Sequence, residues 1–252
     1  MAVQKQANPK DNLAAVKHMY RYKNIMLCLC LLILLAHPIS TAIASAQTIQ
    51  SKITIINTTK KEQLKNRVLL DARDLKICQA SSVSGAKCLA ANTFHSNQGD
   101  LASFYDIGWA FGTANLKETD DVLIFADKAQ DRNALAGLLF LAGHQKVSVW
   151  TGKISELQKL LGSAAGQGRG ILRSEIYSGI MRDHYIALPD EIEALDKNGW
   201  QIVIVPNLKP DLELKDKKLL IAGKSPIKNI ATFAQLQAEG QHHLLLSIDN
   251  KP

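Results

Sequence analysis

Short apolar runs and amphipathic stretches alternate along the chain after residue 66. Residues 68–70, 122–125 and 147–150 form apolar runs of strand length, each next to polar or charged residues. Such runs are typical of strands that are buried on both faces. Residues 133–142 place leucines at helical spacing and end at Gly143, which indicates a helix between the last two strands. A strand, a helix and a strand at this short spacing predict a parallel sheet with a right-handed crossover.

The same order returns after a glycine-rich stretch. Residues 162–170 contain four glycines in nine positions, a composition that predicts a flexible linker between two domains. Three apolar runs and one helical stretch follow it, at residues 201–205, 219–222, 230–238 and 244–248. Residues 123–149, shifted by 97 positions, align with residues 220–246 without a gap and with five identities. The chain is therefore predicted to contain a degenerate internal repeat.

The N-terminal region has a different pattern. Five basic residues accompany an apolar run at residues 25–36, and small residues end in Ala-Ser-Ala at position 46. A basic region, an apolar run of this length and an A-x-A end predict a secretory signal peptide that is cleaved after Ala46. The alternative is an uncleaved anchor over residues 25–46. A histidine and a proline interrupt that span, and its apolar core is shorter than the ~20 residues that a bilayer requires.

These patterns divide the chain into four parts: a signal peptide at residues 1–46, an α/β domain at 47–161, the linker at 162–170 and a shorter α/β unit at 171–252. The 252 residues include 30 Lys and Arg against 23 Asp and Glu, a net charge of +7. Without residues 1–46 the count is 25 against 22, which leaves +3. Because the basic excess lies mostly in the targeting segment, no nucleic-acid partner is predicted, and no membrane span is expected after cleavage.

Four stretches carry a family resemblance. Residues 69–73, Leu-Leu-Asp-Ala-Arg, resemble the strand that opens a rhodanese domain, and residues 82–86 end in the Gly-Ala of that family's "HIPGA" motif. Residues 120–125 resemble the strand that leads to its active-site loop, and residues 141–152 resemble its "GH..V.vl.GG" segment. Their order and spacing make the chain similar to rhodanese-like sulfurtransferases.

The resemblance implies a rhodanese-like three-layer α/β fold with a central parallel sheet. The shorter second unit implies a tandem arrangement similar to thiosulfate sulfurtransferases, with a degenerate second half. The resemblance also implies structural roles for five residues. Asp71 and Arg73 occupy positions that brace the neighbouring loop in this family, and Gly85, Gly143 and His144 occupy turn and packing positions.

Rhodanese chemistry implies a cysteine where the central strand meets the following helix. There the helix N-terminus and backbone N–H groups stabilise a thiolate, which attacks the sulfane sulfur and carries it as a persulfide. In this chain Ala126 follows the strand, Gly223 occupies the corresponding point of the second unit, and no cysteine follows Cys88. The sequence therefore predicts a catalytically silent, secreted protein, periplasmic in a Gram-negative cell. It would act as a binding or accessory module in sulfur or thiol metabolism, or as a structural partner-binding protein of the cell envelope.

Cys78 and Cys88 are the only cysteines after the predicted signal peptide. In an oxidising compartment they favour a structural disulfide, which for a loop of about ten residues contributes ~2–3 kcal/mol in the chain-entropy model. The alternatives are two plain thiols, or a redox-active pair that would make the chain a thiol-based sulfurtransferase or oxidoreductase. The pair lacks the CxxC spacing that tunes a thiol pKa.

The candidate ligand-binding loop follows the strand end. Its polar residues are Asp127, Lys128, Gln130, Asp131 and Arg132. Lys128 and Arg132 are placed to hold an anion at the helix N-terminus, and an ordinary solvated turn is the alternative. The histidines do not have metal-ligand spacing, so neither a metal nor a cofactor is predicted. The expected partner is a protein or a small anionic or sulfur-containing ligand.

Overall fold

The computed structural model describes residues 52–58, 60–96, 99–205 and 217–248. The predicted signal peptide and its cleavage point lie outside these residues. Among the helices that the described residues form, none is both long and apolar enough to cross a membrane. The division of the chain into domains stays a prediction.

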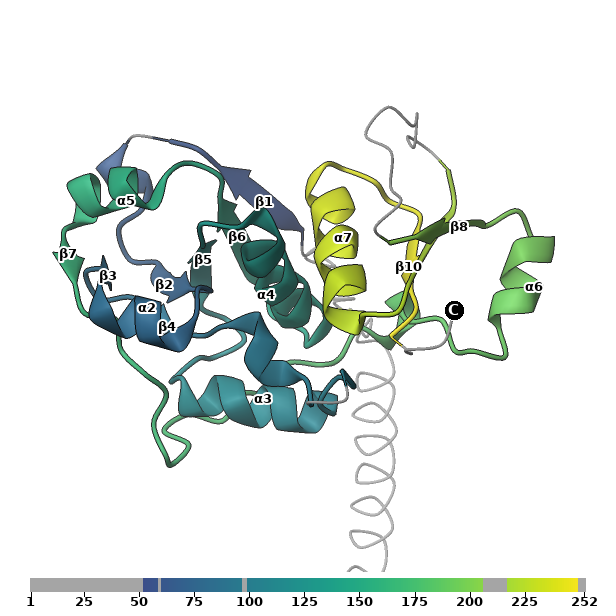
Figure 1. Cartoon of the computed structure of the whole chain (residues 1–252), viewed down its shortest axis with the longest axis horizontal. Coiled ribbons are helices and arrows are strands. Elements are labelled where there is room, and N and C mark those ends of the chain that lie inside the picture. The colour runs from purple at the N-terminus through teal and green to yellow at the C-terminus, as the bar shows by residue number, and fades with distance from the viewer. Residues whose placement is uncertain (1–51, 59, 97–98, 206–216, 249–252) are drawn as a thin grey trace, which may run out of the picture. The chain divides into compact units, whose positions relative to one another are not determined.

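A five-stranded parallel sheet forms the centre of the first unit (Figure 1). Its strands are β1 (Ile53–Ile56), β2 (Val68–Asp71), β4 (Lys87–Cys88), β5 (Asp121–Phe125) and β6 (Lys146–Trp150), in the order β1-β6-β5-β2-β4. Every neighbouring pair in it is parallel, so the predicted α/β class with a central parallel sheet is confirmed. The sequence patterns missed the two edge strands, because β4 is two residues long and only Ile53 of β1 is fully buried.

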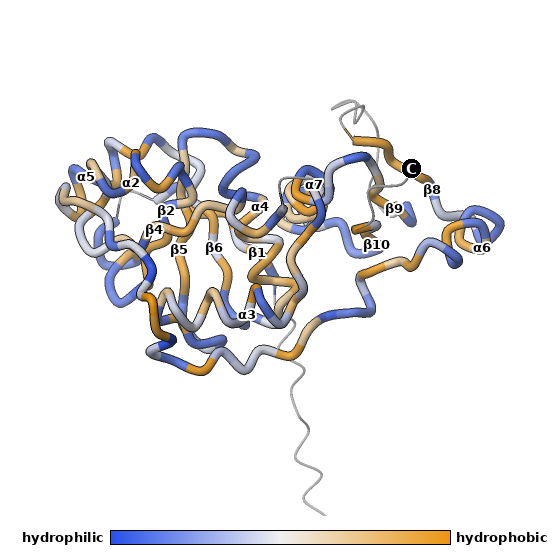
Figure 2. The backbone as a smooth tube through the Cα atoms, turned by 60° about the horizontal axis from the view of Figure 1, so that its bottom comes forward, coloured by the Kyte–Doolittle hydropathy of each residue, from blue (hydrophilic) through white to orange (hydrophobic). Residues whose placement is uncertain are grey.

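Helices cover both faces of this sheet. They are α2 (Leu75–Ala80), α3 (Phe104–Thr113), α4 (Ala129–Leu141) and α5 (Ile154–Leu161), with the 3-10 turns η1 (Lys61–Gln63) and η2 (Ala91–Phe94). Alternate residues of a strand point to opposite faces. On β5, Val122 and Ile124 belong to the core that includes α3 and α4, whereas Leu123 and Phe125 pack in the core that includes α5. The inner strands are therefore hydrophobic along their length (Figure 2), as a sheet covered on both faces requires.

A second parallel sheet has three strands in the order β10-β9-β8. The elements of this unit are η3 (Asp183–Tyr185), α6 (Ile192–Lys197), β8 (Gln201–Ile204), β9 (Leu219–Ala222), α7 (Pro226–Ala238) and β10 (Leu244–Leu246). Ser225 starts α7, because its side chain accepts a hydrogen bond from the Lys228 N–H and Pro226 occupies the first turn. Both are common helix-starting features.

The two units repeat the same strand–helix–strand order at a fixed distance in sequence. Ala129 and Leu141 bound α4, and a shift of 97 positions gives Pro226 and Ala238, which bound α7. Both helices are followed by a glycine with positive φ, at 90° and 95° for positions 143 and 240. Glycine adopts this conformation without the steric cost that other residues meet.

Helix α4 lies beside α7 (Figure 1), and every residue from 133 to 141 is buried. Its own glycine allows this close approach. A Cβ atom at Gly137 would lie 2.5 Å from Cγ2 and 2.8 Å from the carbonyl oxygen of Ile230. A side chain at that position would push the two helices apart, so the packing of α4 on α7 depends on this glycine.

The predicted linker, residues 162–170, packs against the first unit along part of its length. Its strand β7 (Ser163–Ala164) pairs antiparallel with β3 (Ser82–Val83). The Gly166 N–H donates to the Cys78 carbonyl at 3.0 Å, and the Cys88 N–H donates to the Gln167 carbonyl at 2.8 Å. A Cβ atom at Gly166 would lie 2.6 Å from Cys88 Sγ. Close packing, rather than freedom of the backbone, accounts for the glycine at position 166.

Candidate functional site

The candidate site lies where β5 ends and α4 begins. Ala126 follows β5 and is 4% exposed, and α4 starts three residues later at Ala129. Lys128 is the N-cap residue, and its side chain makes no capping hydrogen bond. The first N–H groups of α4 therefore lack the side-chain acceptor that commonly satisfies a helix start.

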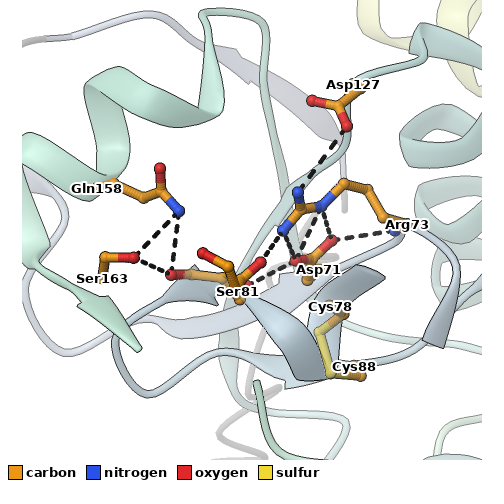
Figure 3. A network of polar contacts seen from close by, with 9 residues as sticks. Asp71, Arg73, Cys78, Ser81, Cys88, Asp127, Gln158 and Ser163 are labelled. Carbon is orange, nitrogen blue, oxygen red and sulfur yellow. Dashed lines mark hydrogen bonds and ion pairs between the residues drawn. A yellow bond between two sulfur atoms is a disulfide. The ribbon is translucent and has the colours of Figure 1, made fainter. Parts of the chain in front are cut away.

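A buried ion pair from the end of β2 supports one side of the site (Figure 3). Asp71 is fully buried, and its carboxylate accepts hydrogen bonds from Arg73 Nη2 and from Ser82 Oγ, both at 2.6 Å. Arg73 also donates to the Ser81 carbonyl at 2.7 Å, and its Nη1 lies 3.9 Å from Asp127 Oδ2. The hydrogen bond to Asp71 raises the pKa of Arg73 above its ordinary value. The guanidinium is thus held in one orientation beside the loop.

A pocket of about 640 Å³ opens beside the loop. It is lined by Arg73, Ala126, Asp127, Arg132, Thr151, Gly152, Lys153, Ile154, Ser155, Glu156 and Gln158. The Nε atom of Arg132 is buried and has no hydrogen-bond partner among the described residues, and burial lowers the pKa of this guanidinium. An unpartnered buried N–H donor next to an uncapped helix start is an arrangement that an anion would satisfy.

A second pocket, of about 310 Å³, shares Arg73 and Asp127 with the first. Asp127, Lys128 and Asp131 line it, together with Arg73. Gln130 is exposed and lines neither of these two pockets. Of the five predicted loop residues, the structure therefore places Asp127 in both pockets, Arg132 in the larger one and Lys128 and Asp131 in the smaller one.

Neither a family model nor a curated protein sequence matches the chain. Solved structures do. SseA from Escherichia coli, described with the rhodanese fold of 3-mercaptopyruvate sulfotransferases, superposes with a TM-score of 0.61 at 12% identity, over 79% of this chain and 99% of SseA. A probable thiosulfate sulfurtransferase gives a TM-score of 0.51 at 14% identity, over 73% of this chain and 92% of the other. The chain has the rhodanese fold.

A third match is a variant of EanB in complex with ergothioneine, with a TM-score of 0.56 and 10% identity. It covers 78% of this chain and 61% of the EanB chain. The likeness at these identities is one of fold. The rhodanese fold confirms the resemblance that the short motifs indicated, although the sequence identity in each match is low.

The loop between β5 and α4 contains no sulfur atom, because residues 126–128 are alanine, aspartate and lysine. Ala126 lines the larger pocket. A side chain at position 126 thus borders the space in which a ligand would lie.

The predicted disulfide is confirmed and lies away from this loop. Cys78 on α2 and Cys88 on β4 are bonded, with Cα atoms 5.7 Å apart, and both are buried. Across the sheet, Phe125 at the end of β5 is paired with Asp71, and Asp71 is paired with Cys88. Two interstrand spacings separate Cys88 from the end of β5, about 10 Å along the hydrogen-bonding direction.

The corresponding loop of the second unit is closed by a buried amide. Asn229 is fully buried, and its Nδ2 donates to the carbonyls of Gly223 and Ser247, each at 3.1 Å. A shift of 97 positions relates Arg132 to Asn229, so the cation of the first unit is replaced by a neutral group. A Cβ atom at Gly223 would lie 2.8 Å from Asn229 Oδ1, which leaves no room for a side chain at this position.

His144 lies at the opposite end of α4. It is fully buried, its Nε2 donates to the Asp120 carbonyl at 2.9 Å, and the Tyr177 hydroxyl lies 3.3 Å from Nδ1. Burial lowers the pKa of His144 to about 4, so the imidazole is neutral near pH 7 and its Nδ1 accepts the Tyr177 hydrogen bond. Gly85, with φ of 79°, also lies in a turn, between β3 and β4.

The described residues contain no group of three or more histidine, cysteine or acidic residues that could hold a metal ion. Sequence reasoning assigned Arg73 a structural role and missed its position in both pockets. It also missed residues 151–156, which follow β6. One feature of the sequence predicts a site position for Arg73 and for residues 151–156. Both follow predicted parallel strands, and the carboxyl ends of such strands meet at the edge of the sheet where ligands bind.

Proposed function

We propose that this chain is an exported rhodanese-fold protein that binds a small anion and does not transfer sulfur. The proposal rests on two features that occur together at the loop between β5 and α4. A methyl group, that of Ala126, occupies the strand–helix junction, and the neighbouring pocket contains Arg73 and Arg132. The binding function of the loop is retained while the nucleophile is absent.

Sulfur transfer by the rhodanese route requires a thiolate at the junction to attack the sulfane sulfur and hold it as a persulfide. Ala126 offers no lone pair for this attack. The two cysteines of the first unit are joined to each other and buried, and the chain passes close to their sulfur atoms at Gly166. This burial also argues against the rival function, a thiol-based oxidoreductase or sulfurtransferase, because thiol exchange requires access of the attacking thiolate to a sulfur atom.

Three features of the loop support anion binding. The start of α4 has no side-chain cap, so its N–H groups and the helix dipole favour negative charge. Arg132 Nε has no partner among the described residues. Arg73 is already oriented by Asp71, so little conformational entropy is lost when it binds an oxyanion. Thiosulfate, sulfite and phosphate share the charge and oxygen acceptors that these donors require.

Asp127 limits the affinity of this site for an anion. Its carboxylate lies 3.9 Å from Arg73 Nη1 and is 67% exposed. An anion that approaches Arg73 displaces this weak contact, and repulsion from Asp127 limits its affinity. We therefore expect a modest affinity that rises in Asp127→Asn, and an accessory role in exported sulfur or thiol metabolism. The disulfide supports export, since such bonds persist in oxidising compartments.

The test compares the wild-type chain with Ala126→Cys. Wild-type protein is expected to give no thiosulfate:cyanide turnover above the rate without protein. In Ala126→Cys, the new thiolate is expected to attack the sulfane sulfur of thiosulfate and release sulfite, and mass spectrometry of the peptide that contains position 126 should find one added sulfur atom. Binding of thiosulfate to wild-type protein is measured by calorimetry in parallel. Turnover by wild-type protein, or a persulfide on Cys78 or Cys88, would refute the silent assignment.

A further inference from the structure

The disulfide between Cys78 and Cys88 lies beneath a single layer of exposed chain. The two cysteines are 0% and 2% exposed. Residues 162–167, called the cover segment here, are all exposed except for Gly166, which is partly buried. A Cβ atom at Gly166 would lie 2.6 Å from Cys88 Sγ and closer still to Cys78 Sγ. The backbone of this glycine is therefore in contact with both sulfur atoms.

Backbone hydrogen bonds hold the cover segment in place. The Gly166 N–H donates to the Cys78 carbonyl at 3.0 Å, and the Gln167 N–H donates to the Ala86 carbonyl at 2.8 Å. Exposed segments with few buried apolar contacts open locally at a lower free energy than the core. A catalytic thiol requires access in every turnover, whereas a switch requires it only once per change of state. Local opening of the cover segment is sufficient for the second role.

The cover segment also supports the residues that orient the anion site (Figure 3). Its strand β7 pairs with β3, and Ser163 Oγ donates to the Ser82 carbonyl at 3.3 Å. Ser82 Oγ donates to Asp71 at 2.6 Å, and Asp71 accepts from Arg73 at the same distance. Hydrogen bonds thus connect the cover segment through Ser82 and Asp71 to the guanidinium that lines both pockets.

The two cysteines flank the same ion pair. Cys78 lies on α2, and the C-cap residue of this helix, Ser81, accepts a hydrogen bond from Arg73 at 2.7 Å. Cys88 is paired with Asp71 between β4 and β2. The disulfide therefore joins the helix that contacts the guanidinium to the strand beside its counter-ion.

Reduction changes the space that the two sulfur atoms require. Bonded sulfur atoms are about 2 Å apart, whereas non-bonded heavy atoms stay ~3.5 Å or more apart. The two thiols must therefore separate by about 1.5 Å, next to a glycine backbone that already contacts both. Close-packed sites respond to such an expansion with shifts of the backbone. The exposed cover segment is the part of this site that moves most readily.

We infer that the Cys78–Cys88 disulfide is a redox switch for the anion site, an inference that rests on the anion-binding function proposed above. With the bond formed, the cover segment and β3 hold Arg73 in its binding orientation. When a dithiol opens the bond, the cover segment separates from the first unit and Ser82 loses its contact with Ser163. Arg73 then loses its fixed orientation, and the affinity for the anion falls.

The reductant is a dithiol, a class that includes proteins with a C-x-x-C pair. One thiolate of the reductant attacks Sγ of one cysteine, which forms a mixed disulfide and releases the other cysteine as a thiolate that takes up a proton. The second thiolate of the reductant then attacks the mixed disulfide. The products are two cysteine thiols and the disulfide of the reductant, so two electrons and two protons pass to the protein.

The test compares the oxidised full chain with the chain reduced by dithiothreitol. Inorganic phosphate is the probe, because it reacts neither with thiols nor with disulfides. Its affinity, measured by calorimetry, is expected to fall about ten-fold on reduction, within the usual range for coupled sites. Hydrogen–deuterium exchange of the Gly166 and Gln167 amides is expected to become at least about ten-fold faster. An unchanged far-ultraviolet circular dichroism spectrum shows that the reduced chain is folded.

Gly166→Ala tests the same coupling while the disulfide stays formed. Its Cβ would collide with both sulfur atoms and displace the cover segment. Phosphate affinity is expected to fall about as much as on reduction, and dithiothreitol should reduce the bond about ten-fold faster than in wild-type protein. Gly168→Ala is the matched control and should behave as wild type, because its Cβ would meet only the side-chain amide of Gln79, at 2.9 Å.

Two kinds of result would overturn the switch. One is exchange of the Gly166 and Gln167 amides at the same rate in both redox states. The other is equal phosphate affinity of the oxidised, reduced and Gly166→Ala proteins. Failure of the anion-binding function gives a different result, since the oxidised wild-type chain then binds no phosphate. In that case the control of an anion site is refuted as well, even where the amides of the cover segment respond to reduction.

Discussion

The loop after β5 and the loop after β9 have the same place in two copies of one supersecondary unit, yet their chemistry differs. The first has Ala126 beside a pocket with a buried, unpartnered Arg132 Nε. In the second, Asn229 replaces Arg132 and ties the carbonyl of Gly223 to that of Ser247. The same strand–helix junction thus borders a pocket in one unit and forms a closed structural corner in the other.

The opposite ends of the two helices differ much less. His144 Nε2 donates to the Asp120 carbonyl, and 97 positions later Gln241 Nε2 donates to the Lys217 carbonyl. The hydrogen bond is kept although the side chain has changed. The repeat therefore preserves what holds each helix in place and varies what the helix N-terminus faces, as expected when function resides in loops on a conserved scaffold.

The largest effect is expected where the first unit has a brace at its loop. Asp71→Ala leaves the largely buried Arg73 without its counter-charge and Ser82 without its acceptor. Breaking one partner of a buried ion pair costs about 3–5 kcal/mol, and urea denaturation followed by circular dichroism measures this loss. Asp127→Ala removes an exposed partner of the same arginine, and at most about 0.5 kcal/mol is expected there. Equal effects of the two substitutions would show that Asp71 does not act as a brace.

A pH-dependent effect is expected from His144 and not from its counterpart Gln241. Burial lowers the pKa of His144 from 6.5 to about 4, so the unfolded chain binds a proton over this window and the folded protein does not. The free energy of unfolding therefore decreases as pH falls from about 6.5 to 4, by at most about 3 kcal/mol, and none of this loss occurs above pH 7. Thermal melts across this range measure the change.

The second unit supplies the control for this experiment. His144→Gln introduces the residue that makes the equivalent hydrogen bond at position 241. The variant is expected to keep the contact to the Asp120 carbonyl and to lose the part of the pH dependence that comes from the imidazole. If wild-type protein and the variant have the same pH profile, burial of His144 does not determine stability in this window.

Much of the fold is visible in the sequence because buried parallel strands are continuous apolar runs. Residues 122–125 and 147–150 predict two inner strands and the cysteine pair favours the disulfide, whereas the edge strands β1 and β4 are too exposed or too short to be predicted. The site was only partly predictable. Ala126 and Arg132 follow directly from the strand end, whereas the position of Arg73 beside the pocket depends on the pairing of β2 with β5.

The role of a glycine is harder to predict from sequence than the role of an apolar run. The composition of residues 162–170 indicates flexibility, but a Cβ atom at Gly166 would collide with the disulfide. Gly137 and Gly223 similarly have neighbours within 3 Å of a Cβ position. Sequence shows that a glycine is present, and only the packing shows whether it serves the backbone conformation or a close neighbour.

The steric difference between the two loops predicts opposite responses to the same new side chain. Gly223→Cys places a Cβ 2.8 Å from Asn229 Oδ1 and 2.9 Å from the Val205 carbonyl, and overpacking of this kind costs about 1–3 kcal/mol. Ala126→Cys adds its sulfur at the wall of an open pocket, and a change below about 0.5 kcal/mol is expected. Urea denaturation of both variants under reducing conditions measures the difference. A tolerated Gly223→Cys variant that also accepts sulfur from thiosulfate would show that the second loop is a masked site rather than a closed corner.

The smallest effect in stability should be the most informative about binding. Arg132→Gln removes the charge that faces the first pocket, so thiosulfate affinity should fall about ten-fold, which corresponds to ~1.4 kcal/mol. Lys128→Gln, on the smaller pocket, is the matched control and should lower the affinity much less, because an exposed lysine is screened by solvent.

Asn229→Ala in the second unit should lower stability and leave anion binding unchanged. The substitution leaves two buried carbonyls without a donor, which costs about 1–3 kcal/mol in stability. Calorimetric titration and urea denaturation of the three variants separate the two roles. If Asn229→Ala weakens thiosulfate binding as much as Arg132→Gln does, the two loops are coupled and the division of labour between the units is wrong.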